Sequence, residues 1–121
     1  MKYRREEILR YEFTEKVICD FKIINDLPNE SNFLEGQVVD LSPSGLKLFS
    51  SVDLPTEKKL ILYVEFTINV EPIRFSADLI WKKNVGNGFH YGLKQQGTSE
   101  DKQLLINELK LYAKTKRNKG K

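Results

Sequence analysis

Two long segments in which hydrophobic and polar residues alternate constrain the fold of this chain most strongly. From Leu60 to Ile68 the hydrophobic residues fall at every second position, and the same period returns from Ile73 to Trp81. The short stretch 69–72 (NVEP) between them has the composition of a turn. A period of two is typical of strands that bury one face. The pattern therefore predicts a β-hairpin with one face in a core, and it places Trp81 in that core.

Further segments with the same period predict about six strands in all. The stretches 17–24 (VICDFKII) and 36–41 (GQVVDL) each favour a strand, and hydrophobic alternation resumes at 46–48 after a Ser/Pro/Gly turn. Another turn, 84–88 (NVGNG), precedes a last alternating segment at 89–93. Short strands at such close spacing indicate an antiparallel β-barrel or sandwich.

Two residues with reactive side chains fit structural positions in this pattern. Cys19 shares the phase of the hydrophobic residues in its strand, which predicts a small buried core residue. His90 lies out of phase with its hydrophobic neighbours and is predicted to face solvent.

The period changes after the last strand. Leu105, Leu109 and Tyr112 recur at helical spacing, and Thr98 followed by Asp101 resembles a capping box. This predicts one C-terminal helix from about residue 99 to 114, with its apolar face against the strands. The fold class is all-β: a six-stranded antiparallel β-barrel with one C-terminal α-helix.

Length and composition indicate one domain of 121 residues. We divide it into an N-terminal arginine arm (1–16), a β-barrel (17–97), the helix (98–116) and a basic tail (117–121). With one cysteine and one histidine, the chain can form neither an internal disulfide nor a Cys/His zinc site. The same count argues against a catalytic Ser/His or Cys/His pair. Without a long apolar run, no membrane span or signal peptide is expected. We therefore expect a cytoplasmic protein that is not an enzyme.

The basic residues are unevenly distributed. The chain has 20 basic and 17 acidic residues, and the segment from Lys110 to Lys121 holds six of the basic ones and no acidic one. The rest of the chain is therefore slightly acidic. A barrel that binds single-stranded nucleic acid combines a basic groove with exposed aromatic residues, whereas most aromatic residues here follow the core phase. No DNA or RNA partner is expected.

The N-terminal arm carries three arginines, Arg4, Arg5 and Arg10, within the sequence RREEILR. A guanidinium group offers a planar fork of donors that matches phosphate oxygens, and it also matches the O6 and N7 edge of guanine. By itself the segment fits an ordinary charged chain terminus better than a binding site.

The turn at residues 40–45 (DLSPSG) is the second candidate. Asp40 could accept hydrogen bonds from the two donors on one edge of guanine, and the Ser42 hydroxyl could meet a base or phosphate without bulk. Pro43 fixes a turn, and Gly45 permits a positive φ or a close backbone approach. The same residue types would also serve in a purely structural turn.

Taken together, these features resemble the PilZ domain family, of the stand-alone receptor type. The family pattern is RxxxR near the start of the domain followed by D/NxSxxG, and residues 40–45 match the second motif at every specified position. Residues 80–81 (IW) and 91–93 (YGL), followed by a C-terminal helix, also look alike. The resemblance covers the chain from Tyr3 to about Lys114.

This resemblance implies a six-stranded antiparallel barrel that binds the bacterial second messenger cyclic di-GMP. The arginines would grip phosphates and stack on or bond to guanine, with Arg5 and Arg10 as the leading pair. The acidic and hydroxyl side chains of the turn would meet a guanine edge. The binding residues implied in this way are Arg4, Arg5, Arg10, Asp40, Ser42 and Gly45.

The arginine spacing departs from the family pattern, because four residues (EEIL) separate Arg5 from Arg10 instead of three. We expect a receptor, without a cofactor, that binds cyclic di-GMP and relays it to an unidentified effector protein as its arm becomes ordered. A monomer or weak homodimer is expected. The alternative is a PilZ-like adaptor that binds a protein partner and has lost nucleotide binding.

Overall fold

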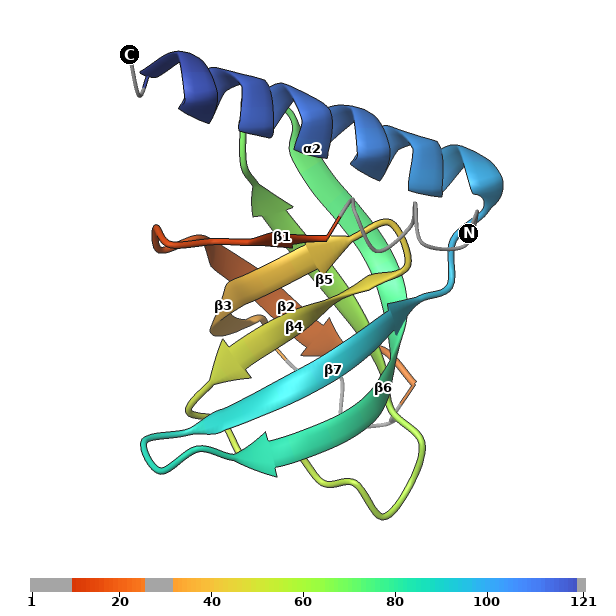
Figure 1. Cartoon of the computed structure of the whole chain (residues 1–121). Coiled ribbons are helices and arrows are strands. Elements are labelled where there is room, and N and C mark those ends of the chain that lie inside the picture. The colour runs from red at the N-terminus through yellow and green to blue at the C-terminus, as the bar shows by residue number, and fades with distance from the viewer. Residues whose placement is uncertain (1–9, 26–31, 120–121) are drawn as a thin grey trace, which may run out of the picture.

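Six antiparallel strands close into a barrel in the computed structural model, which describes residues 10–25 and 32–119, with side chains up to Thr115. The strands pair in the order β3-β2-β5-β6-β7-β4, and β4 pairs with β3 to close the barrel (Figure 1). This confirms the predicted fold class. The barrel strands are β2 (Ile18–Ile23), β3 (Leu34–Ser42), β4 (Gly45–Ser50), β5 (Ile61–Thr67), β6 (Pro72–Asn84) and β7 (Phe89–Gln95).

An additional short strand, β1 (Tyr11–Glu12), lies in the segment that we assigned to the N-terminal arm. It pairs with Leu41 and Asp40 at the C-terminal half of β3, while β2 pairs with the N-terminal half. Two residues are too few to show a period, so the sequence did not predict this strand. Its position brings the base of the arm beside the end of β3.

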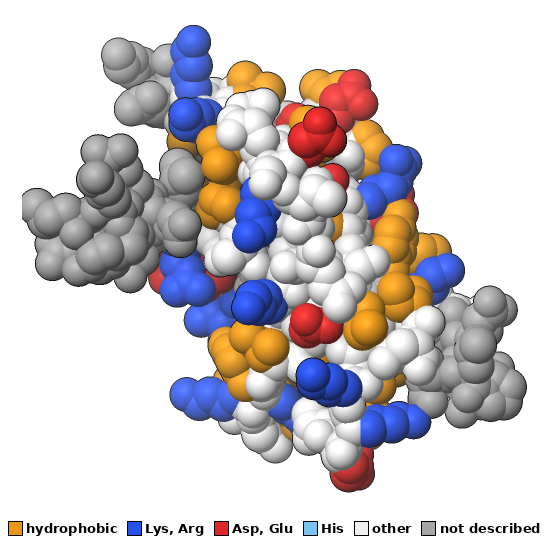
Figure 2. All heavy atoms as spheres, turned by 90° about the vertical axis from the view of Figure 1, so that its right-hand side faces the viewer, with side chains coloured by type: hydrophobic (Ala, Val, Ile, Leu, Met, Phe, Trp, Pro, Cys, Tyr) orange, Lys and Arg blue, Asp and Glu red, His pale blue; other side chains and the backbone are white. Residues whose placement is uncertain are grey.

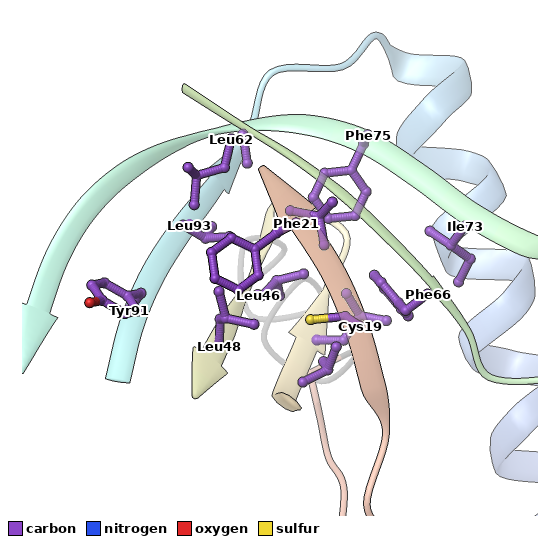
Figure 3. Packing of buried hydrophobic residues seen from close by; sticks show 14 of the residues in the cluster. Cys19, Phe21, Leu46, Leu48, Leu62, Phe66, Ile73, Phe75, Tyr91 and Leu93 are labelled. Carbon is purple, nitrogen blue, oxygen red and sulfur yellow. The ribbon is translucent and has the colours of Figure 1, made fainter. Parts of the chain in front are cut away.

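The predicted alternation describes the core well. The hairpin of β5 and β6 pairs in register from Ile61 opposite Asp78 to Thr67 opposite Pro72. Its inward side chains join those of the other strands in a single cluster (Figure 3). Cys19 lies in this cluster with 1% of its surface exposed, as predicted. Burial raises the pKa of its thiol to about 12, so the cysteine is a neutral core residue.

The one helix among the described residues, α2 (Ser99–Lys119), lies across one end of the barrel (Figure 1). The predicted capping box is present, because the Asp101 amide donates to Thr98 Oγ1 at 3.3 Å and the Thr98 amide donates to Asp101 Oδ2 at 3.0 Å. Leu105, Leu109 and Tyr112 are buried, as their spacing predicts. In the described part of the chain, no helix combines the length and apolar character needed to cross a membrane.

Two β-bulges interrupt the regular pairing. In β3 the register shifts between Val38 and Asp40, and in β6 it shifts between Leu79 and Trp81. A bulge adds an unpaired residue and reverses the inward and outward phase beyond it. The prediction that Trp81 lies in the core is therefore wrong: the bulge at Ile80 turns the indole outward, and Trp81 is 43% exposed.

Candidate functional site

A half-open pocket of about 310 Å³ lies on the outside of the barrel, beside the turn between β3 and β4. Arg10, Asp40, Ser42 and Gly45, four of the residues implied by the resemblance, all line it. Arg4 and Arg5 lie outside the described residues. The other walls come from β4, β6 and β7. Residues far apart in the sequence thus meet at one site.

The Asp40 carboxylate is the central group of this pocket. The bulge in β3 places its side chain on the outer side of the barrel, yet only 4% of that side chain is exposed. Arg10 Nε lies 3.8 Å from Oδ1 and Lys47 Nζ lies 3.7 Å from Oδ2. Oδ1 is buried and has no hydrogen-bond partner among the described residues. A buried acceptor without a donor is costly, so this oxygen is free to accept from a ligand.

The sequence analysis did not single out Lys47, which faces Asp40 directly across the two strands. The pairing of Ser42 with Gly45 across the tight turn sets the register, so that Leu41 opposes Leu46 and Asp40 opposes Lys47. Counting outward from the turn could therefore have found this lysine.

The pocket is positively charged overall. Three cations line it, Arg10, Lys47 and Lys94, against the single carboxylate of Asp40. The nearby His90, which was predicted to face solvent, is half-buried against Phe49. Its pKa is lowered by burial and then by the positive charges of Lys47 and Lys83, so it is neutral at pH 7. The arrangement suits an anionic ligand.

The basic residues on one face of the molecule do not form a continuous band (Figure 2). On the side of the molecule shown in Figure 2, described Lys and Arg side chains are scattered among hydrophobic and uncharged ones. A nucleic-acid-binding surface gathers such residues on one face or stripe. The described residues also contain no group of three or more His, Cys, Asp or Glu that could hold a metal ion.

The turn itself is held tightly against β7. The Gln95 amide donates to the Ser44 carbonyl oxygen at 2.7 Å, and the hydroxyls of Ser42 and Ser44 are 3.1 Å apart. A Cβ on Gly45 would lie 1.9 Å from the Leu93 carbonyl oxygen, so only glycine fits there. Gly45 therefore serves the close approach of two strands. The contact of Ser42 with a ligand stays a prediction.

Trp81 forms part of the pocket wall that the sequence analysis missed. It pairs with Gly92 on β7, and a Cβ on that glycine would lie 2.1 Å from the indole Nε1. The indole thus rests on the backbone of β7 and remains partly exposed toward the pocket. An exposed aromatic face of this kind can stack on a nucleobase. The glycine in the stretch YGL is the sequence signal for this contact.

The closed barrel and the cationic pocket on its surface define a small antiparallel β-barrel domain. The sequence pattern of the PilZ domain matches residues 3–111, so the chain belongs to the PilZ domain family. PilZ domains are regulatory binding domains. No curated protein matches this chain significantly.

Nine chains of known structure match this one, and they include the following three. The PilZ domain of YcgR from Escherichia coli, solved with c-di-GMP, has a TM-score of 0.66 at 16% identity over 92% of this chain and 93% of that one. The PilZ domain of CeSA from a cellulose-synthesizing bacterium has a TM-score of 0.58 at 16% identity, covering 80% and 90%. The inhibitor of motility MotI/DgrA from Bacillus subtilis has a TM-score of 0.59 at 14% identity, covering 88% and 54%.

Proposed function

We propose that this domain binds cyclic di-GMP in the pocket beside the turn at residues 40–45 and relays its presence to an effector protein. The observation that carries the proposal is the environment of Asp40: a buried carboxylate oxygen with no donor among the described residues, in a pocket lined by three cations. Membership of a family that includes a domain solved with c-di-GMP supports the same ligand. No bond of the ligand is broken in this role, so the protein is proposed to be a receptor and not an enzyme.

The chemistry of the ligand matches the residues around the pocket. Guanine presents N1–H and an exocyclic amine on one edge, and a carboxylate such as that of Asp40 accepts from both. Arg10 and Lys47 would neutralise the phosphates, and a guanidinium can also bond to the guanine O6 and N7 edge. The exposed indole of Trp81 offers a stacking surface for a base.

The arm would convert binding into a signal. Arg10 lines the pocket, and the next residue, Tyr11, packs its ring against those of Phe13 and Tyr112 at the base of the arm. The ligand would draw Arg5, and Arg4 if needed, onto its phosphates and so order the arm against the barrel. An effector that binds only the ordered surface would then respond to the ligand.

One sequence feature favours the adaptor instead. The arm has an extra residue between Arg5 and Arg10, and two of the intervening residues, Glu6 and Glu7, are acidic. Negative charge at this position would oppose a dianionic ligand unless both side chains point away. An adaptor would keep the barrel and its partner surface without nucleotide binding.

Isothermal titration calorimetry with cyclic di-GMP, and with GTP as a control ligand, tests the proposal. We expect selective binding of cyclic di-GMP with a Kd of about 1 µM or tighter, and a loss of at least about tenfold, or 1.4 kcal/mol, for Arg10→Ala and Asp40→Asn. Arg74→Ala removes an arginine outside the pocket, one that pairs with Glu65, and should leave the affinity unchanged. Absence of heat and of thermal stabilisation with the intact chain would favour the adaptor.

A further inference from the structure

A second groove, of about 470 Å³, lies between the start of β6 and the first half of α2. It shares no residue with the pocket beside the 40–45 turn. The buried side chains of Ile73, Phe75 and Leu105 line it, and Leu104 borders it with 63% of its surface exposed. The groove therefore combines an apolar lining with an uncovered leucine at its edge.

The charged residues around this groove are mostly acidic. Glu71, Asp101 and Glu108 all line it, and in the described part of the chain none of the three is paired with a cation. The groove also contains Arg74, but its Nε lies 3.5 Å from Glu65 Oε2. Among the described residues, Asp101 and Glu108 accept hydrogen bonds only from neutral groups, which leave their negative charges in place. The groove thus carries uncompensated negative charge.

Gln95 provides an independent observation at the same place. It is one of the residues that line the groove, only 5% of it is exposed, and its side-chain carbonyl oxygen Oε1 has no hydrogen-bond partner within the described residues. A buried acceptor that lacks a donor destabilises the folded state. A donor that enters the groove would remove this destabilisation, which points to a ligand that carries N–H groups.

We propose that the groove binds an arginine side chain of a partner protein, presented on a segment with neighbouring hydrophobic residues. A guanidinium carries five donors in a planar fork, so it can bond to the Gln95 carbonyl and to a carboxylate of the groove together. The adjacent hydrophobic residues of the segment would cover Leu104. This proposal does not depend on nucleotide binding at the other pocket.

The basic segment Lys110–Lys121 of a second copy of this chain is the competing occupant, since its charge is also complementary. Such a contact would join the end of one molecule to the groove of the next. A head-to-tail contact of this kind forms open assemblies unless its rotation closes a ring. A segment from a different protein instead forms a complex of two molecules that does not extend further. We therefore favour a different protein as the occupant of the groove.

Titration of the ¹⁵N-labelled full chain with a capped peptide, Ac-Ala-Leu-Arg-Leu-Ala-NH2, tests the proposal by NMR. The shifts should concentrate at residues 71–75, 95 and 101–108. Replacing the arginine by citrulline keeps the shape and removes the charge, and it should weaken binding by about fivefold or more. Equal binding of the citrulline peptide, scattered shifts, or equally tight binding of N-acetyl-arginine amide alone would overturn the proposal.

A matched set of variants separates the groove from general electrostatic attraction. Glu71→Gln combined with Glu108→Gln removes two charges, and a glutamine at 108 can still accept from Asn69. This variant should bind the peptide at least about fivefold more weakly than the unmodified protein does. The affinity of Glu100→Gln should stay within about twofold of the original value. Glu100 is an exposed acid on the same helix that does not line the groove. Equal losses of affinity in the two variants would overturn the proposal.

Self-association that disappears when residues 116–121 are removed would also overturn the proposal, because the tail would then occupy the groove.

Discussion

At the scale of single residues, the pocket depends on positions where neighbouring atoms leave no space for a larger side chain. Gly92 is the clearest of these, because the indole of Trp81 occupies the space that a Cβ would need. The two residues form one unit: the glycine lets the indole lie against β7, and the indole gives the pocket its aromatic wall. An aromatic residue at position 81 alone would not produce this surface.

Gly92→Val should displace the indole, since a Cβ would lie 2.1 Å from its Nε1. Trp81 is the single tryptophan of the chain, so its fluorescence reports this change directly. We expect a shift of the emission maximum, a loss of stability of about 1–3 kcal/mol from overpacking, and weaker cyclic di-GMP binding. Urea denaturation measures the loss of stability, and titration with cyclic di-GMP measures the loss of affinity. An unchanged emission maximum would contradict the described contact between the two residues.

At the scale of elements, the strands were predictable because each barrel strand buries one face, which imposes a period of two on the sequence. The bulges could not be predicted, since an extra residue such as Ile80 has no distinctive composition. It only reverses which residues face inward and which face outward beyond it. This is why Trp81 was placed inside. Each bulge also turns one side chain toward the pocket, Asp40 in β3 and Trp81 in β6. The site is therefore built by local irregularities that the alternation of hydrophobic and polar residues does not reveal.

The contents of the site were predictable only in part. The motif at residues 40–45 identified Asp40 as a site residue, because all residues of a short motif lie close together in the sequence. The pocket wall formed by β6 and β7 depends on closure of the barrel, which brings Lys94 beside Gly45 across strands distant in the chain. Such pairing follows from the whole topology and has no local signal.

The helix boundary offers a prediction at the same scale. The Thr98 hydroxyl accepts from the Asp101 amide, which satisfies one of the unpaired donors at the start of α2. Thr98→Ala should therefore destabilise the protein by about 1 kcal/mol. Urea denaturation followed by circular dichroism measures this loss. Ser is a good N-cap residue too, so Thr98→Ser should recover most of it, and equal stability of the alanine and serine variants would argue against the cap.

At the scale of the whole molecule, the barrel and the arm contribute differently to stability and to function. The hydrophobic cluster lies within the barrel and against α2, and the rings of Tyr11, Phe13 and Tyr112 pack together where the arm joins the barrel. Deletion of residues 1–9 should leave these contacts in place. The shortened protein is therefore expected to unfold with nearly the same free energy as the intact chain in the absence of ligand.

The two proteins should differ once cyclic di-GMP is added. A ligand that binds only the folded state at 100 times its Kd stabilises it by about 2.7 kcal/mol, which raises Tm by roughly 10 °C in a domain of this size. Removing residues 1–9 deletes Arg4 and Arg5 while Arg10 remains, so the proposed arm predicts that most of this thermal shift is lost at the same ligand concentration. Differential scanning calorimetry with and without ligand measures both effects. A full thermal shift in the shortened protein would show that Arg10 and the barrel suffice, because the arm would then contribute nothing to binding.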